Sequence, residues 1–141
     1  MSKGNTFEND LVKLIFNKVS ITGIATAATG VANLYVGLHT ADPGETGDQT
    51  TSQVAYAPYA RIAKARTAGV WTVSGSTVRP VANLDFAACT GGTTGVATYF
   101  SIGTEATGNG KILYSGAISP SISIGSGVTP RLTTASTITE D

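Results

Sequence analysis

The chain has 141 residues, the length of one ordinary domain, and we expect a single domain over residues 1–141. Nine Lys+Arg balance nine Asp+Glu, and charged residues are only 13% of the sequence. The chain therefore lacks the excess of positive charge that is typical of a free-standing nucleic-acid or membrane binder. Copies of the chain should also repel one another only weakly. The single cysteine, Cys89, excludes an internal disulfide and a multi-cysteine zinc site.

The N-terminal segment predicts the one clear helix of the chain, over residues 5–17. Asn5 is placed to cap the first turn, with Glu8 three residues later to reciprocate. The apolar residues at helical spacing are Phe7, Leu11, Leu14 and Ile15. One amphipathic helix cannot hide such a stripe alone, so it lies either on its own sheet or on a partner's, and the sequence leaves both open.

The same segment does not predict a signal peptide. Lys13 interrupts the apolar run Leu11–Phe16, no long apolar stretch follows, and no membrane-spanning segment is predicted anywhere in the chain. The expectation is therefore a protein that is made in the cytoplasm and stays there until it is assembled.

The rest of the chain predicts strands. Leu34, Val36 and Leu38 share one face at strand period, which indicates a core strand. Further short β-rich runs are Ala60–Ala65, Val70–Val73, Ser76–Val78, Leu84–Phe86, Thr98–Ile102, Lys111–Ala117, Ser121–Ile124, Val128–Leu132 and Ser136–Thr139. Gly75 and Gly108-Asn109-Gly110 mark hairpins between such runs. Many short strands at close spacing predict an all-β, jelly-roll-like antiparallel β-sandwich with one short N-terminal helix.

Residues 40–53 predict a long exposed loop after the core strand. Pro43 and Gly44 supply turn chemistry, and a polar run follows them. The loop is longer than a hairpin needs, and long ordered loops in compact domains are commonly functional. It is therefore the first candidate for a protein contact, through Asp42 and Glu45, and the alternative is a mobile connector.

The sequence does not predict an enzyme. His39 is the only imidazole, and Asp42 lies three residues away, but serine and threonine are so abundant that a triad drawn from these residues carries no information. The favoured interpretation of His39 is a strand-end residue that is hydrogen-bonded locally or exposed. We expect no catalytic residue and no cofactor.

Glycine-rich segments and carboxylates give no binding motif either. Gly108–Lys111 lacks the spacing of a phosphate loop and precedes a strand, while Thr90–Gly95 predicts a flexible, hydroxyl-rich loop. Asp42, Glu45 and Asp48 could chelate calcium loosely, but their order differs from that of known calcium loops. We expect no metal and no small-molecule substrate.

One segment brings aromatic rings and cations together in a chain that is otherwise poor in charge. Its members are Tyr56, Tyr59, Arg61, Lys64, Arg66 and Trp71. Tyrosine, tryptophan and arginine often anchor interfaces, so all but Trp71 are candidate protein-contact residues. The alternative places Trp71 in the core and the two arginines on a solvated face. For a nucleic-acid patch the segment has too few basic neighbours.

The sequence carries a resemblance to a known protein family. The segments that carry it are Asn33–Glu45, above all His39-Thr40-Ala41-Asp42-Pro43-Gly44-Glu45, then Tyr59-Ala60-Arg61, Trp71 and Thr137–Asp141. They resemble a family of small tailed-phage virion proteins, from the N-terminal helix to the end of the chain. Within that family the chain looks like the capsid cement, or decoration, proteins.

The resemblance implies a jelly-roll cement protein that sits as a homodimer on the outside of a capsid. Its partners would be a second copy and the major capsid protein, without direct contact to nucleic acid, and it would be made in the cytoplasm of the host bacterium. Many weak contacts on a lattice add through multivalency. The alternative is a tail-fibre or baseplate-associated structural or adhesin domain, and a third class is a small virion hydrolase.

Overall fold

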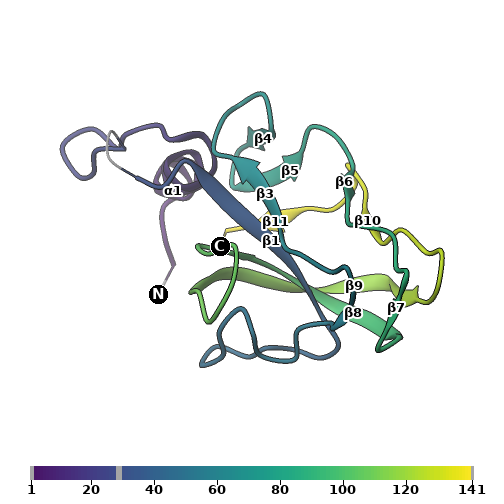
Figure 1. The fold of residues 1–141 in the computed structure, drawn as a ribbon. Coiled ribbons are helices and arrows are strands. Elements are labelled where there is room, and N and C mark those ends of the chain that lie inside the picture. Colours follow the sequence, from purple (N-terminus) through teal and green to yellow (C-terminus); the bar gives the residue numbers. More distant parts are fainter. Residues whose placement is uncertain (1, 28–29, 141) are drawn as a thin grey trace. The chain divides into compact units, whose positions relative to one another are not determined.

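The computed structural model describes residues 2–27 and 30–140 (Figure 1). The chain divides into two compact units. Unit 1 comprises Met1–Asn33, Ala65–Asn83 and Leu132–Asp141. Unit 2 comprises Leu34–Lys64 and Leu84–Arg131. Each unit is therefore assembled from segments that are far apart in the sequence. The expectation of a single domain stays a prediction.

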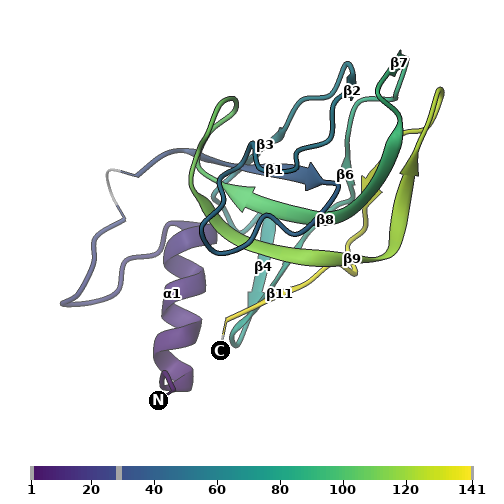
Figure 2. The ribbon, with the colours of Figure 1, turned by 90° about the horizontal axis from the view of Figure 1, so that it is seen from below.

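Unit 2 is built on a four-stranded sheet with the order β3-β1-β8-β9. The bounds of these strands are Ile62–Ala65 for β3, Asn33–His39 for β1, Gly95–Gly103 for β8 and Ile112–Ile124 for β9. Figure 2 shows β8 between β1 and β9, and both pairs of neighbours are antiparallel. Leu34, Val36 and Leu38 are all buried, which confirms the core strand that their spacing predicts.

The long strand β9 departs from the sequence prediction of two separate runs. Ala97 pairs with Ile122 and Tyr99 pairs with Ala117, so one residue of β8 faces four residues of β9, three more than in a regular ladder. The strand continues through this bulge, although Pro120 lies within it. Because β9 is the last strand of the sheet, a proline there removes no hydrogen bond to a further strand. A proline, which the sequence analysis takes as the end of a run, is therefore tolerated within β9.

Two smaller strand pairs complete the pairing of unit 2. β2 (Tyr56–Ala57) pairs with β7 (Gly91–Gly92), and β6 (Leu84–Asp85) pairs with β10 (Arg131–Leu132). The prediction of a flexible loop at Thr90–Gly95 is thus wrong for Gly91 and Gly92, which form a strand. Gly92 has a φ of +82°, and a Cβ there would lie 3.0 Å from the backbone N of Ala57, so glycine permits this close approach.

Unit 1 packs one helix against a three-stranded sheet. The helix α1 spans Asn5–Asn17, and the sheet has the order β11-β5-β4, formed by Ile138–Thr139, Thr77–Pro80 and Trp71–Ser74. Gly75, at a φ of +60°, turns the β4–β5 hairpin as predicted. Phe16 of α1 meets Trp71 of β4 edge to face, with ring centroids 5.1 Å apart. Trp71 is thereby a core residue, 1% exposed.

The helix has the predicted bounds but a different buried face. Val12 and Phe16 are fully buried, whereas Phe7 of the predicted stripe is 43% exposed and Leu11, Leu14 and Ile15 are only partly buried. The buried face of α1 is the one that contacts the β4–β5 hairpin. It is rotated by one residue from the predicted stripe, so Val12 and Phe16 are buried in place of Leu11 and Ile15. The helix therefore lies on its own sheet.

The predicted capping box at the start of α1 is also wrong. Gly4 occupies the N-cap position, with no side-chain cap, and its carbonyl accepts a hydrogen bond from Glu8 N at 3.1 Å. Asn9 Nδ2 instead donates to Gly75 O at 2.6 Å and ties the helix to the hairpin. Tertiary contact thus replaces the local cap that the sequence pattern indicates.

The fold class is the predicted one, an all-β, antiparallel sandwich-type fold with one short helix. Across residues 2–27 and 30–140 there is no helix with the length and apolar composition to span a membrane.

Candidate functional site

The loop at residues 40–53 is closed at its base by the strand that precedes it. Thr40 N donates to Ser52 O at 2.7 Å, and Val54 N donates to Leu38 O at 3.1 Å. His39 and Gln53 form an isolated antiparallel bridge at the same place. The segment is therefore a compact Ω-loop whose two ends meet.

Gln49 anchors this loop to the connection between β8 and β9. The residue is fully buried, its backbone N donates to Gly110 O at 2.9 Å, and its Oε1 accepts from Glu105 N at 2.9 Å. Its Nε2 has no hydrogen-bond partner in the part of the chain that the structure describes. Nothing in the sequence distinguishes Gln49 from other loop residues, so sequence analysis missed it.

Arg61 fastens the same two loops from the other side. Its Nε and Nη2 both donate to Gln53 Oε1, at 2.9 and 2.6 Å. Nη1 donates to Glu105 O at 3.1 Å and Nη2 to Gly108 O at 2.8 Å. Arg61 is only 8% exposed, and a planar guanidinium can satisfy several acceptors at once. Its observed contacts are therefore within the chain.

The two candidate tyrosines lie on the aromatic side of unit 2. Tyr59 OH accepts from Leu38 N at 2.9 Å, and its ring stacks on Phe86 with a centroid distance of 6.1 Å. Tyr56 is 3% exposed, meets Tyr59 edge to face and donates its hydroxyl to Ala87 O at 2.9 Å. Burial raises the pKa of Tyr56 to about 12, so it stays protonated at neutral pH. Tyr56 therefore has almost no exposed surface with which to contact another protein.

Lys64 and Arg66 are separated between the two units. Lys64 is half-buried on β3 in unit 2. Arg66 belongs to unit 1, where its Nη2 and Nε donate to the carbonyls of Leu14 and Ile15, at 2.6 and 2.5 Å, in the last turn of α1. A cation on these otherwise unpaired carbonyls stabilises the helix end. The residues of the aromatic and cationic segment are therefore divided between the two units.

His39 lies at the end of β1 with both ring nitrogens occupied. Nδ1 is 2.7 Å from Thr51 O, and Nε2 is 2.8 Å from Ser101 Oγ. Because a carbonyl only accepts, Nδ1 carries the proton and Nε2 accepts from the serine hydroxyl. Both His39 and Ser101 are fully buried, so this serine–histidine pair does not reach solvent. His39 stands at the strand end and is hydrogen-bonded, as the sequence interpretation has it, but its partners are 12 and 62 residues away in the sequence.

Burial is the main reason why the pKa of His39 lies below its usual 6.5, with a smaller contribution from the positive charge of Arg61 and an opposing one from the bond to Thr51. The unfolded chain therefore binds the proton first as the pH falls. The stability that depends on neutral His39 is complete above pH 6.5 and is lost as the pH decreases toward the folded pKa.

We expect the melting temperature to stay level from about pH 8 down to pH 6.5 and to fall from there toward about pH 5, as the unfolded chain takes up a proton on His39. His39→Gln should remove this dependence, because the chain has no other histidine. Thermal melts of both proteins across that range test it. The same slope in both would contradict the assignment.

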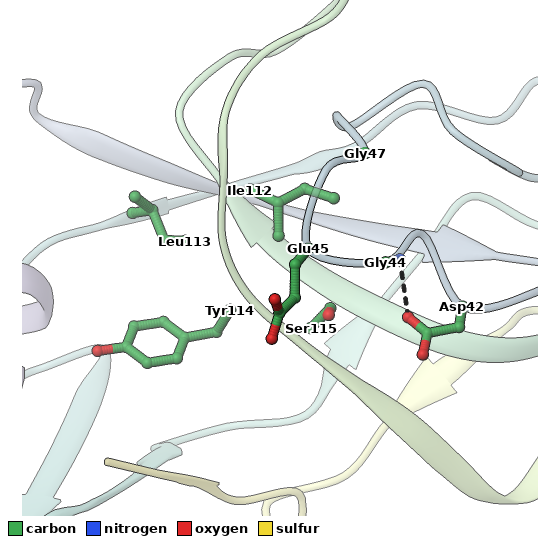
Figure 3. Close-up of a pocket in the computed structure, with 8 residues that line it drawn as sticks. All are labelled: Asp42, Gly44, Glu45, Gly47, Ile112, Leu113, Tyr114 and Ser115. Carbon is green, nitrogen blue, oxygen red and sulfur yellow. Dashed lines mark hydrogen bonds between the residues drawn. The ribbon is translucent and has the colours of Figure 1, made fainter. Parts of the chain in front are cut away.

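The exposed half of the Ω-loop borders a pocket of about 360 Å³ beside the start of β9 (Figure 3). It is lined by Asp42, Gly44, Glu45, Gly47, Ile112, Leu113, Tyr114 and Ser115. Asp42 Oδ1 accepts from Gly44 N at 2.9 Å, and the Glu45 side chain extends toward Ser115 (Figure 3). Asp42 and Glu45 are both exposed. Asp42 makes this turn and is no partner of His39.

A second pocket of about 170 Å³ lies where Tyr59 and Arg61 meet the loop between β8 and β9. Neither pocket brings together ligands for a metal. Among the described residues, no three His, Cys, Asp or Glu side chains are placed to hold an ion. Asp42 and Glu45 form an exposed, acidic rim beside the start of β9.

Residues 2–139 match the protein family described as Podophage GP4 fiber I protein gp80. No curated protein matches the chain.

Proposed function

The chain belongs to the family of Podophage GP4 fiber I protein gp80, a family of phage virion structural proteins, and from this premise we propose that it is a capsid cement protein. In this proposal a homodimer binds the outer surface of the major capsid lattice and stabilises the shell. Cementing requires no chemistry, because each copy only bridges neighbouring subunits and opposes the pressure of packaged DNA.

A role without catalysis is supported by the environment of the only histidine. His39 is fully buried, and its bonds to Thr51 O and Ser101 Oγ take up both ring nitrogens. A general base has to lie within hydrogen-bond reach of its substrate. We therefore propose that the Ser101–His39 pair serves the loop base, and that the protein is not an enzyme and needs no cofactor.

The observation that carries the cement proposal is the pinned Ω-loop. Gln49 and Arg61 hold its inner side through buried hydrogen bonds, while Asp42 and Glu45 on its outer side are exposed. A surface that is already ordered loses little conformational entropy when it binds. Repeated on a lattice, such contacts add through multivalency even when each is modest.

The direct test is to add the purified protein to capsids that have been stripped of it, and to pellet them. The cement proposal expects dimers in light scattering and co-pelleting that saturates at a fixed ratio to the capsid protein. Electron microscopy of virions should then show density for this chain on the head. Density on the tail alone, with none on the head, would reject the proposal.

The second candidate is a tail-fibre or baseplate-associated structural or adhesin domain, favoured by the word fiber in the family's description. Fibres are commonly trimeric, so this candidate expects a stable trimer that ignores capsids and binds the host envelope. The same light-scattering and pelleting experiment separates the two candidates.

For the contact surface we expect Glu45→Lys to weaken co-pelleting with capsids without changing the melting temperature. Glu45 is exposed, so the reversed charge alters the rim and leaves the core intact. The matched control is Glu105→Lys, the same charge change at an exposed residue of the loop between β8 and β9. Equal saturation curves for Glu45→Lys and wild type would remove this rim from the capsid contact.

A further inference from the structure

The outer edge of β9 is the most conspicuous unprotected feature of unit 2. β9 has 13 residues, stands last in the sheet order and, within the described residues, pairs with β8 alone. Its sequence, ILYSGAISPSISI, contains no charged residue. A long edge strand without charges presents unpaired backbone groups to any strand that approaches.

The opposite edge of the same sheet is different. β3 has only four residues, IAKA, and carries Lys64. Short length and a lysine are two devices by which proteins keep an edge from pairing. The four-stranded sheet therefore has one protected edge, β3, and one unprotected edge, β9.

We propose that two copies of this chain dimerise by antiparallel pairing of their β9 edges about a two-fold axis. A contact of one edge with its own copy is self-complementary and closes after two subunits. Pairing of β9 with β3 would instead continue without limit, and Lys64 opposes it. This inference rests on the homodimer of the proposed function and specifies its interface.

The run of β9 that can pair is bounded on both sides. Pro120 has no N–H, so it ends the run at Ser119. At the other end the Ω-loop borders the strand as far as Ser115, which lines the pocket. The run is thus Ser115–Ser119, and Ala117 is its centre.

Side chains along this run fit a symmetric pair. Ser115, Ala117 and Ser119 are exposed, whereas Gly116 and Ile118 are half-buried, so the faces alternate as in a regular strand. With Ala117 on the axis, Ser115 of one copy lies opposite Ser119 of the other, and small residues meet small residues. The formal net charge of zero adds no global repulsion.

The test is the solution mass of the full chain as a function of concentration, with a lysine placed at the axis. Ala117→Lys puts two like charges directly opposite each other across the axis. We therefore expect the affinity of dimerisation to be at least about tenfold lower than in wild type. The matched control is Ser123→Lys, an exposed residue on the same strand beyond Pro120, which should dimerise like wild type. Mixing Ala117→Lys with Ala117→Glu should restore a dimer.

A cysteine pair gives a second measurement that does not depend on tolerance of a charge. Ala117→Cys should oxidise to a covalent dimer, and Ser123→Cys should not. If wild type is dimeric while Ala117→Lys dimerises equally well and Ala117→Cys stays uncrosslinked, the β9 interface is wrong but the cement proposal stands. If wild type is monomeric at every concentration or trimeric, the homodimer and its interface both fail.

Discussion

Replacing Arg61 by alanine should lower the free energy of unfolding by about 3 kcal/mol, because buried acceptors lose a charged donor and become unsatisfied. The acceptors are Gln53 Oε1, Glu105 O and Gly108 O. The loss should be largest locally, since these bonds join the Ω-loop to the loop between β8 and β9. Denaturant unfolding measures the total effect, and hydrogen exchange at the amides of Thr40 and Glu105 reports the local one.

The controls for Arg61 separate its charge from its geometry. Arg61→Lys keeps the charge but cannot reach three acceptors with a planar fork, so we expect it to remain clearly destabilised. Arg79→Ala removes an exposed arginine from β5 of unit 1 and should change stability by less than about 0.5 kcal/mol. If Arg61→Ala is as stable as Arg79→Ala, the buried fork does not stabilise the fold.

Destabilisation by Arg61→Ala would also affect how a capsid-binding experiment with this variant is interpreted. Arg61 is one of the candidate contact residues, yet its substitution would loosen the Ω-loop that carries Asp42 and Glu45. A loss of capsid binding in Arg61→Ala would therefore report the loop, and only Glu45→Lys tests the rim directly. Tyr59→Ala has the same ambiguity, because its hydroxyl accepts from Leu38 N on β1.

Gly103→Ala should destabilise the protein by about 3 kcal/mol, because a methyl group at this buried position overpacks the site of Gln49. A Cβ on Gly103 would overlap the side-chain amide of Gln49, which is itself fully buried. Expelling that amide also breaks its bond from Glu105 N. Thermal and denaturant unfolding give the size of the effect.

The matched control lies in the same strand. Gly95 of β8 is exposed, and a Cβ there would meet nothing within 4 Å, so Gly95→Ala should be nearly neutral. A double variant, Gly103→Ala with Gln49→Ala, should be less destabilised than the sum of the two single changes, since it removes the overlap. Additive effects in that cycle would show that the two residues do not compete for one space.

Much of the fold could be predicted because strand and helix periods are local properties. The spacing of Leu34, Val36 and Leu38 identifies a core strand whatever lies beside it. Gly75 identifies the β4–β5 hairpin for the same reason, since a positive φ is required where the chain turns. The candidate site was predicted less well, because the sequence gives the type of each side chain but does not show whether that side chain is buried or exposed.

The aromatic and cationic segment shows this limit. Its residues suggest one contact patch, yet Arg61 is buried under two loops of unit 2, and Arg66 caps α1 in unit 1. Asp42 and Glu45 are exposed on a loop, where the polar sequence places them. Their contact with a partner stays a prediction, as it does for Tyr56, Tyr59 and Lys64.

By itself the sequence determined the all-β class, the single N-terminal helix, most strand positions and the membership in a phage virion family. Only the tertiary structure decided which face of α1 is buried, that β9 runs through Pro120, and that Gln49 and Arg61 fill the space beneath the Ω-loop. The physical reason is that burial and hydrogen-bond partners depend on segments far apart in the sequence, such as Arg61 and Glu105. Local patterns restrict backbone conformation, whereas packing across the chain determines which polar side chains are removed from water.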